Sequence, residues 1–382
     1  MSNSALILLM NDSARTGLRQ PLLLTPAMGT PLLSWLTAAL AQRGICRYAL
    51  VCQARFAPAA AHCFPEGAAL TVCTDHLATQ PLLRFLSHHL EQTVLVITGA
   101  CVCLPSGGRE ENAAPCACHV PYSALVDALG GEDFSFCSFL RTHAVACTEA
   151  DGLYPVASLQ ELNRGVRQMH EARLSMLLQQ GVELWDAQHC YIDPSVSIGA
   201  GTVLLPGAIL RGHTVIGRDC VIGPNAMLEN TRLGNGCHIG TSQLYDSQLG
   251  SDCSVDSFCD LRSTTLGNRV RVGSSCTLSA VALGDGTHVG AGCTLRALTA
   301  GRSCRLGAGC LTGAQGPDAC GSITLEDDVA LGAGVILTGG CTVGRSAGAC
   351  AGVTLSDPVP AQALAASKSK PTIRKDWVLH NK

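Results

Sequence analysis

The chain has 382 residues and a formal charge of −3, and only 4% of its residues are aromatic although 47% are hydrophobic. This charge provides no basic field for nucleic acid, and no apolar run approaches membrane-spanning length. The 22 cysteines could form a disulfide framework, but such frameworks are typical of small secreted chains with little core. The Ala5–Met10 stretch lacks the basic flank and cleavage site of a signal peptide. We therefore expect reduced thiols and a cytoplasmic location.

The first hundred residues alternate between strand-like and helix-like segments. Strands are expected at Ala5–Met10, Tyr48–Cys52, Ala69–Cys73 and Val94–Ile97, and helices over Thr30–Arg43 and Pro81–Leu90. Such alternation is typical of a parallel α/β sheet. Because ligands bind beyond the carboxyl ends of strands in these sheets, the loops after Met10 and Thr98 are candidate sites.

Two Cys-x-Cys pairs come next, Cys101 with Cys103 and Cys116 with Cys118, the second followed by His119. Four thiolates and an imidazole could bind zinc or an iron–sulfur cluster. Zinc knuckles, however, favour two or more residues between paired ligands, and a cysteine-rich chain produces such pairs by chance. Ordinary reduced thiols are the preferred interpretation, with a metal site as the alternative.

A helix is expected from Ser158 to Gln180. Ser158 and Glu161 have the spacing of a capping box, and Gly181 supplies the residue that ends the helix. Its expected apolar face consists of Leu159, Leu162, Val166, Met169, Leu174, Leu177 and Leu178. This helix would connect the α/β part to the rest of the chain.

From Ile192 to Leu355 an aliphatic residue recurs every six residues, with occasional five-residue steps such as Leu228 to Leu233. Such hexapeptide repeats are typical of a parallel β-helix. Small residues occur four places after each aliphatic residue, and cysteine often takes this place, at Cys220, Cys237, Cys253, Cys259, Cys276, Cys293, Cys304, Cys310 and Cys341. We interpret these cysteines as small hydrophobic core residues. The period breaks between Leu311 and Ile323, where a loop is expected.

The layout resembles the bifunctional N-acetylglucosamine-1-phosphate uridyltransferase/glucosamine-1-phosphate acetyltransferase family (GlmU type). The segments Gln179–Asp186, Tyr191–Pro194 and Val221–Asn225, with Ala363–Ala365 and Lys375–Trp377, are similar to that family. The resemblance implies a Rossmann-like nucleotidyltransferase-type domain, a linker helix and a left-handed β-helix. The expected parts are a truncated nucleotidyltransferase-like domain (1–157), the helix (158–181), the β-helix (182–356) and a basic tail (357–382).

Most residues that the resemblance implies for uridyl transfer are replaced. Arg15 matches a substrate-binding position, but the glycines of the phosphate loop are Asn11 and Ser13. The two Mg²⁺-binding positions of the family correspond to Ala100 and Ala157, which carry no ligand atoms in their side chains. We therefore expect no bound magnesium and no uridyl transfer by the usual mechanism.

The acetyltransferase positions are also changed. The family's general base is a histidine, and its position corresponds to Ala291; His288, expected near a corner of the same coil, is a possible substitute. The lysines of the sugar-phosphate site align with Leu278–Ala280, and the N-Y-D-G loop with Gly313–Gly316. Positions that match are Arg262 for a substrate phosphate and Ala308, Ala351 and Lys368 for acetyl-CoA.

Three hypotheses follow. The first is a catalytically impaired homologue, folded and homotrimeric, that binds a phosphosugar or nucleotide sugar or acts as a scaffold. The second is an acyltransferase that uses acetyl-CoA with an altered acceptor and His288. The third is a metal-binding protein built on the cysteine pairs. None of them calls for nucleic acid or a membrane.

Overall fold

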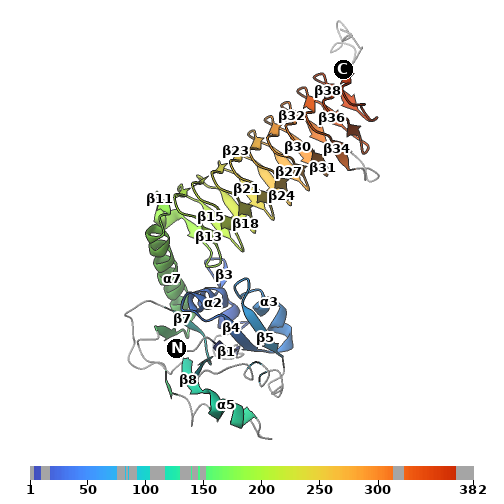
Figure 1. Cartoon of the computed structure of the whole chain (residues 1–382). Helices are drawn as coiled ribbons and strands as arrows, with labels where there is room; N and C mark the ends of the chain where they lie inside the picture. The colour runs from blue at the N-terminus through green and yellow to red at the C-terminus, as the bar shows by residue number, and fades with distance from the viewer. Residues whose placement is uncertain are drawn as a thin grey trace, which may run out of the picture. The chain divides into compact units, whose positions relative to one another are not determined.

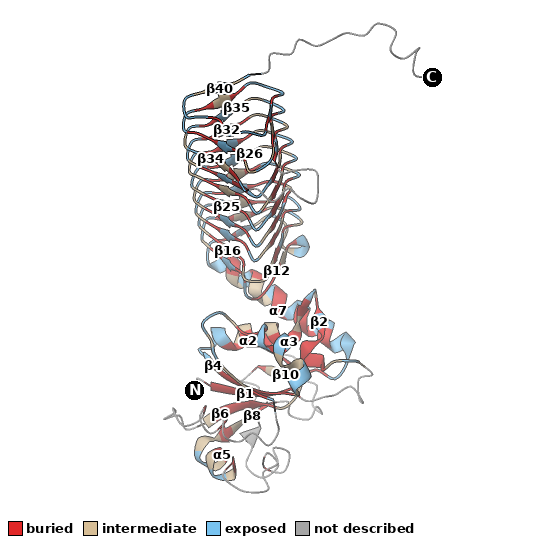
Figure 2. Cartoon of the chain, turned by 90° about the vertical axis from the view of Figure 1, so that its right-hand side faces the viewer, coloured by how far each residue is buried: buried red, intermediate tan, exposed pale blue. Residues whose placement is uncertain are grey.

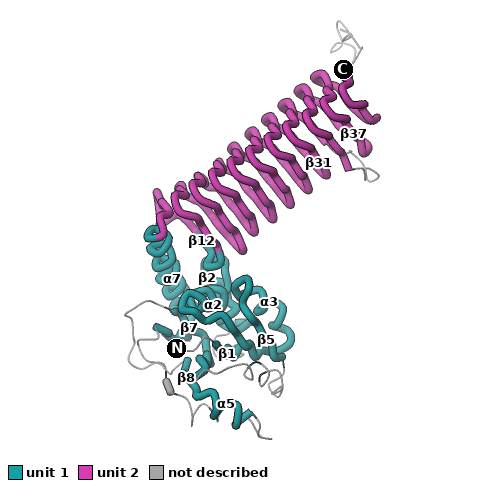
Figure 3. Tube along the Cα trace, viewed as in Figure 1, with its two compact units in different colours: residues 1–179, 192–195 teal, residues 180–191, 196–382 magenta. Residues whose placement is uncertain are grey.

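A computed structural model gives the structure of the chain (Figure 1). It describes residues 4–9, 18–74, 82, 85, 93–103, 117–129, 139, 145–146, 152–312 and 322–366. The chain forms two compact units (Figure 3): unit 1 contains Met1–Gln179 and Ile192–Ser195, and unit 2 contains Gln180–Tyr191 and Val196–Lys382. None of the helices in the described ranges has the length and apolar character needed to cross a membrane.

Unit 1 is built on a six-stranded sheet with the strand order β5-β4-β1-β6-β8-β9. Its strands are β1 Ser4–Leu8, β4 Arg47–Val51, β5 Ala69–Cys73, β6 Thr93–Ile97, β8 Ala117–Pro121 and β9 Val145–Ala146. The predicted parallel pairing is confirmed for β5, β4, β1 and β6. The sheet continues with antiparallel pairs at β8 and β9, which the alternating pattern did not predict.

The helix predicted over Thr30–Arg43 is α2, Leu32–Gln42. It begins later than predicted because Thr30 and Pro31 form strand β3, which pairs with strand β2, Pro26–Ala27. The shorter elements of this part are η1 Leu22–Leu24, η2 Ala54–Phe56, α3 Ala57–Ala61 and α5 Tyr122–Leu129. The helix predicted over Pro81–Leu90 lies outside the described residues except for Leu82 and Phe85, which are helical and buried.

The predicted long helix is α7, Leu159–Gln179. The Ser158 hydroxyl accepts the Glu161 N–H at 3.2 Å, as predicted, but the Glu161 carboxylate accepts the Ala157 N–H at 2.7 Å instead of the Ser158 N–H. Gly181 follows the helix with φ +85°, a conformation that favours glycine. Leu159 and Leu178 are 45% and 50% exposed, so the prediction that they belong to the apolar face was wrong.

Helix α7 packs against strand β7, Cys101–Cys103, which pairs antiparallel with strand β10, Leu153–Pro155. A Cβ atom at Gly165 would lie 2.6 Å from Cγ1 of Val102, a distance that real side chains do not adopt. Only glycine permits this approach of helix to strand, which brings the buried faces of both elements together.

A buried histidine joins α7 to the segment Ile192–Ser195 inside unit 1. The backbone N–H of Ile192 donates to Nε2 of His170 at 3.3 Å, and the ring of His170 contacts Trp35 edge to face at 5.9 Å. The adjacent Asp193 carboxylate is also buried and accepts a hydrogen bond from the Thr30 hydroxyl. Burial lowers the pKa of His170, although the charges of Glu171 and Asp193 act in the opposite direction.

This histidine makes stability depend on pH. Because its pKa is lower in the folded state, the unfolded chain binds its proton first, and stability present above about pH 6.5 is lost as the pH falls. We expect His170→Gln, whose amide oxygen can still accept the Ile192 N–H, to reduce the drop in melting temperature between about pH 7.5 and about pH 5.5. Calorimetric scans of both proteins measure this, and an unchanged drop in the variant would contradict the assignment.

Unit 2 is a parallel β-helix with three sheets, each running from coil to coil (Figure 1). The β11 sheet contains β11 Glu183–Leu184, β14 Val203–Leu204, β17 Val221–Ile222, β20 His238–Ile239, β23 Ser254–Val255, β26 Arg271–Val272, β29 His288–Val289, β32 Arg305–Leu306, β35 Ala330–Leu331, β38 Gly348–Ala349 and β40 Leu364–Ala365. The β12 sheet contains β12 Tyr191–Ile192, β15 Ile209–Arg211, β18 Met227–Glu229, β21 Gln243–Tyr245, β24 Asp260–Arg262, β27 Thr277–Ser279, β30 Thr294–Arg296, β33 Leu311–Thr312, β36 Ile336–Leu337 and β39 Thr354–Leu355. The β13 sheet contains β13 Ser197–Ile198, β16 Val215–Ile216, β19 Arg232–Leu233, β22 Gln248–Leu249, β25 Thr265–Leu266, β28 Ala282–Leu283, β31 Leu298–Ala300, β34 Ile323–Leu325 and β37 Thr342–Val343. A short η4 helix, Ala187–His189, precedes β12.

The hexad pattern corresponds directly to these strands. Each aliphatic residue of the repeat is the buried residue of its strand, and the residue before it faces outward, so that buried and exposed residues alternate along each coil (Figure 2). The five-residue steps at Leu228–Leu233 and Leu261–Leu266 join strands of the β12 sheet to strands of the β13 sheet without interrupting the coils. The loop predicted between Leu311 and Ile323 lies almost entirely outside the described residues.

The repeated cysteines are buried, as predicted, but they do more than fill space. The Cys276 thiol donates to the Gly290 carbonyl at 3.1 Å, and Cys293 donates to Gly307 at 3.2 Å in the next coil. At the equivalent place Thr287 donates its hydroxyl to the Gly301 carbonyl at 3.0 Å. Cysteine therefore serves here as a small side chain that also donates a weak hydrogen bond to a corner carbonyl.

Substitution of Cys276 separates packing from hydrogen bonding. Cys276→Ala removes the sulfur and its hydrogen bond, so we expect a loss of about 1 to 3 kcal/mol in the free energy of unfolding. Cys276→Val, which places at this position the residue found at the equivalent Val270 and Val335, should cost less than about 1.5 kcal/mol. Denaturant titration measures both, and an alanine variant as stable as the parent would contradict the packing role.

Candidate functional site

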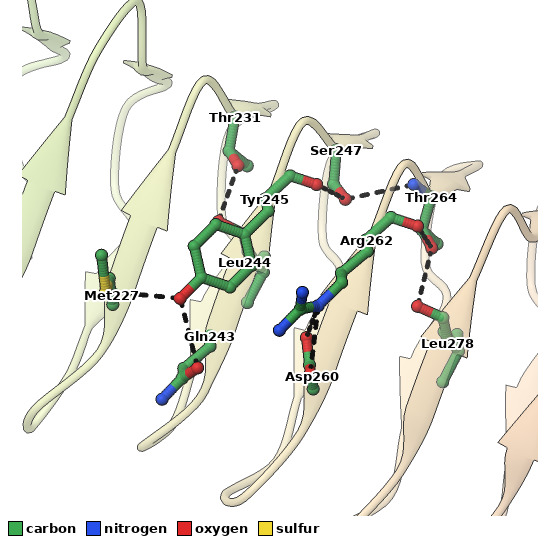
Figure 4. A network of polar contacts seen from close by, with 10 residues as sticks. All are labelled: Met227, Thr231, Gln243, Leu244, Tyr245, Ser247, Asp260, Arg262, Thr264 and Leu278. Carbon is green, nitrogen blue, oxygen red and sulfur yellow. Dashed lines mark hydrogen bonds and ion pairs between the residues drawn. The ribbon is translucent and has the colours of Figure 1, made fainter.

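Arg262, the matched phosphate-binding residue, lies on β24 beside two other polar side chains (Figure 4). Its Nε donates to the Asp260 carboxylate at 3.0 and 3.2 Å. Its guanidinium carbon lies 5.0 Å from the centre of the Tyr245 ring, within the range of a cation–π contact. The Tyr245 hydroxyl in turn donates to Gln243 Oε1 at 3.2 Å. The guanidinium is therefore held from two sides.

The geometry leaves the outer nitrogens of Arg262 available to an anion. The side chain is 59% exposed, and within the described part of the chain its Nη atoms make no hydrogen bond. Hydrogen bonding to Asp260 raises the pKa of the Arg262 guanidinium above its usual value, so the group stays positively charged. The same carboxylate repels an incoming anion, which must therefore bind on the side of the guanidinium away from Asp260.

The β12 sheet places further residues in line with Arg262. In successive strands Tyr245 pairs with Arg262, Arg262 with Ser279, and Ser279 with Arg296, each seventeen residues from the next. Adjacent strands lie about 4.8 Å apart, so the Ser279 hydroxyl lies between two exposed arginines. We name Tyr245, Arg262, Ser279 and Arg296 the arginine row. Tyr245 and Arg296 were not among the predicted site residues, although their seventeen-residue spacing from Arg262 and Ser279 was a usable signal.

The positions implied for acetyl-transfer chemistry form a different group. Ala291, Ala308 and Ala351 are exposed at the corner between the β11 and β12 sheets. The Gly309 N–H donates to the Ala291 carbonyl at 2.9 Å, and the Gly334 N–H donates to the Ala308 carbonyl at 2.8 Å. The structure therefore stacks the base position and the acetyl-CoA positions in one column of alanines, which contains no side chain able to accept a proton.

The arginine row and the alanine column lie on different parts of the coil. Arg262 is the last residue of its strand, next to the corner with the β13 sheet, whereas the alanine column occupies the corner before the β12 strands. A single copy of the chain does not bring the two groups together. Leu278–Ala280, the position of the family lysines, does lie beside Arg262 through the pair Arg262 and Ser279.

His288, predicted near a corner, is the first residue of the two-residue strand β29 and is exposed. Its partners in the neighbouring strands are Arg271 and Arg305. The imidazole is exposed and makes no hydrogen bond with any described residue. A general base is usually oriented by a third group, and His288 lacks one here, so the geometry does not support it as a substitute base.

The two positions of unit 1 that the resemblance implies for magnesium, Ala100 and Ala157, lie close together without offering side-chain ligands. Ala100 precedes β7, and its carbonyl accepts the N–H of Val156, the residue before Ala157. Magnesium requires oxygen ligands, mostly carboxylates and waters, whereas both side chains are methyl groups. These residues therefore do not fit a bound magnesium ion. Arg15, Lys368 and Gly313–Gly316 lie outside the described residues.

The cysteine pairs do not form a cluster in the part of unit 1 that is described. Cys101 and Cys103 lie on β7, Cys118 lies on β8 of another sheet, and Cys116 lies outside the described residues. Burial raises the pKa of the Cys103 thiol, whereas a metal ligand must be a thiolate. No group of three or more potential ligands gathers among the residues that the structure describes, so the metal hypothesis gains no support.

Comparisons with known proteins agree with the repeat pattern. The family model "Bacterial transferase hexapeptide (six repeats)" matches residues 195–230 and 213–242. The model "Hexapeptide repeat of succinyl-transferase" matches residues 263–297 and 299–339. The predicted fold, an α/β domain followed by a helix and a left-handed parallel β-helix, is confirmed, and hexapeptide repeats are matched over residues 195–242, 263–297 and 299–339.

Curated relatives give a more specific resemblance than the repeat models do. A bifunctional protein GlmU from Caldanaerobacter subterraneus is 31% identical over 242 residues, which cover 60% of this chain and 50% of that protein. One from Geobacillus sp. is 31% identical over 213 residues, or 53% of this chain and 44% of that protein. The predicted resemblance to GlmU-type proteins is confirmed over the matched residues. The chain spans about half the length of the curated relatives it matches.

Among solved structures, LpxA from Acinetobacter baumannii matches with 15% sequence identity and a TM-score of 0.29, covering 47% of this chain and 70% of that chain. A score this low adds nothing to what the sequence relatives establish.

The alanines at the magnesium positions lead to a prediction for unit 1. We expect Ala100→Asp alone to produce no uridyl transfer, because one carboxylate does not replace the second ligand at Ala157 or the glycines of the phosphate loop. An assay for pyrophosphate release from UTP with N-acetylglucosamine 1-phosphate and Mg²⁺ measures this, with the unchanged chain as control. Measurable turnover by this single variant would contradict our interpretation of the site.

Proposed function

We propose that this protein is a GlmU-type homologue that binds a phosphosugar or nucleotide sugar on the β12 sheet and catalyses neither of the two transfers associated with that family. The observation that carries the proposal is the arginine row, in which Arg262 and Arg296 flank Ser279 in register. Arginine presents paired N–H donors that suit phosphate oxygens, and the serine hydroxyl adds a donor between them.

The proposed loss of catalysis is supported separately in each unit. In unit 2 the alanine column provides small side chains where an acetyl group and its carrier would lie, but Ala291 provides no base. In unit 1 the methyl groups of Ala100 and Ala157 replace the ligands that would hold magnesium. Binding needs only the charges and hydrogen bonds of the arginine row, so it survives these replacements.

We further propose that the chain self-associates as a homotrimer. A ligand that touches both the arginine row and the alanine column needs residues from two copies, because Arg262 and Ala291 lie at different corners of the coil. The free cysteines, of which Cys46 and Cys350 are exposed, suit a reducing compartment, and we place the protein in the cytoplasm. Sedimentation measures the oligomeric state, and a monomer at micromolar concentration would contradict the trimer.

Two neighbouring substitutions test the binding site in opposite directions. Arg262→Ala is expected to weaken the binding of glucosamine 1-phosphate by about 1.5 to 3 kcal/mol, the value of a charge-assisted hydrogen bond. Asp260→Asn, which removes the competing carboxylate, is expected to strengthen binding. Calorimetry measures both, and Arg232→Gln on the β13 sheet is the matched control. Unchanged affinity in Arg262→Ala would remove this residue from the site.

The proposed lack of turnover has its own test. Incubation of the purified protein with acetyl-CoA and glucosamine 1-phosphate should release no coenzyme A above the rate without protein. Clear acetylation would show that the chain is an enzyme, and would favour an acetyl-CoA-dependent acyltransferase in its place.

A further inference from the structure

A second set of basic side chains lies on the outward side of the β11 sheet. Arg271, His288 and Arg305 occupy the exposed positions of the consecutive strands β26, β29 and β32. They are paired in register, Arg271 with His288 and His288 with Arg305. We name these three residues the basic row. Adjacent strands are about 4.8 Å apart, so the row is straight and follows the axis of the β-helix.

This row differs from the other outward rows of the β-helix. On the β12 sheet two of the outward arginines have an acidic neighbour, since Arg211 pairs with Glu229 and Arg262 bonds to Asp260. On the β11 sheet the outward residues after the basic row are Ala330, Gly348 and Leu364, and Ser254 precedes it. No acidic residue occupies the outward strand positions of the β11 sheet from β23 to β40.

Two carboxylates at the corner between the β13 and β11 sheets accept hydrogen bonds from other residues. Asp285, three residues before His288, accepts hydrogen bonds from the backbone N–H and the side-chain amide of Asn268 at 2.7 and 3.3 Å. Asp327 accepts the backbone N–H of Arg302 at 2.8 Å. Within the described residues, the side chains of the basic row make no hydrogen bond or ion pair.

Such a row is unfavourable for the isolated fold. Like charges on neighbouring strands repel one another, and here two arginines face outward within two strands of each other without a compensating carboxylate between them. An anion that lies along the row would remove this repulsion and satisfy the donors of both guanidinium groups. The corner beside the row consists of small residues, Ser274, Ala291 and Ala308 with their flanking glycines, and so leaves the approach open.

We propose that the basic row is a binding site for a linear oligophosphate group. A chain of linked phosphates carries several negative charges in one direction and can contact Arg271 and Arg305 together, whereas a single phosphate reaches one of them. His288 provides a further polar group between the two arginines. Linked phosphates occur both in free polyphosphate and in coenzyme A. The residues that the resemblance implies for acetyl-CoA, Ala308 and Ala351, lie at the adjacent corner.

Inorganic tripolyphosphate is the probe for calorimetric titration at low ionic strength with the full-length protein. Arg271→Gln and Arg305→Gln should each raise the Kd by about tenfold, and the double variant by more. Arg232→Gln, an outward arginine at the same strand position on the β13 sheet, is the control and should leave the Kd unchanged. Orthophosphate should bind at least about tenfold more weakly than tripolyphosphate.

The outcomes distinguish this site from the proposed sugar site. Arg262→Ala should leave the tripolyphosphate Kd unchanged, so a negative result for one proposal does not affect the other. Competition by coenzyme A would identify its phosphates as the ligand, and its absence would favour free oligophosphate. The proposal is wrong if the parent protein fails to bind tripolyphosphate, if the basic-row variants bind like the parent, or if Arg232→Gln weakens binding equally. Far-ultraviolet circular dichroism confirms that each variant is folded.

Discussion

Backbone hydrogen bonds from each coil to the next are the constraint on which unit 2 depends. The N–H of Val203 donates to the Cys220 carbonyl at 2.8 Å, and the N–H of Val221 donates to the Cys237 carbonyl at 2.9 Å. Because successive side chains of a strand point to opposite faces, this register also determines which outward residues lie above one another. A functional surface of this unit therefore consists of residues one coil apart, and neighbours in sequence contribute little to it.

The same register explains how much the sequence predicted. Aliphatic spacing revealed the strands and the core because one buried residue per strand is required by every coil. The arginine row was not visible in that spacing. A coil of two six-residue steps and one five-residue step places Arg262 above Ser279 and Arg296, whereas the hexads alone assign these residues to unrelated repeats.

Errors in unit 1 have other physical causes. Leu159 and Leu178 follow the helical period of the buried face, but they lie near the two ends of α7 and are 45% and 50% exposed. Apart from the proline, nothing in the local sequence argued against a helix at Thr30 and Pro31. Their pairing with β2 is a contact between segments that the local pattern does not reveal. The bond from Ala157 to Glu161 likewise depends on the path of the chain into the helix. Only the pairing of β2 with β3 is a contact between separate segments that overrides local preference.

The arrangement also implies that a β-helix of this kind would remain folded if it lost catalytic groups at its corners. Stability resides in the inward aliphatic residues, the coil-to-coil ladder and the corner donors such as Cys276, whereas Ala291 is exposed at a corner. Exposed substitutions of this kind usually change stability by less than about 0.5 kcal/mol, so the fold places no requirement on the base position. The fold equally places no requirement on Arg271 and Arg305, whose mutual repulsion only opposes folding. Their presence in register is therefore better explained by a bound anion than by the architecture itself.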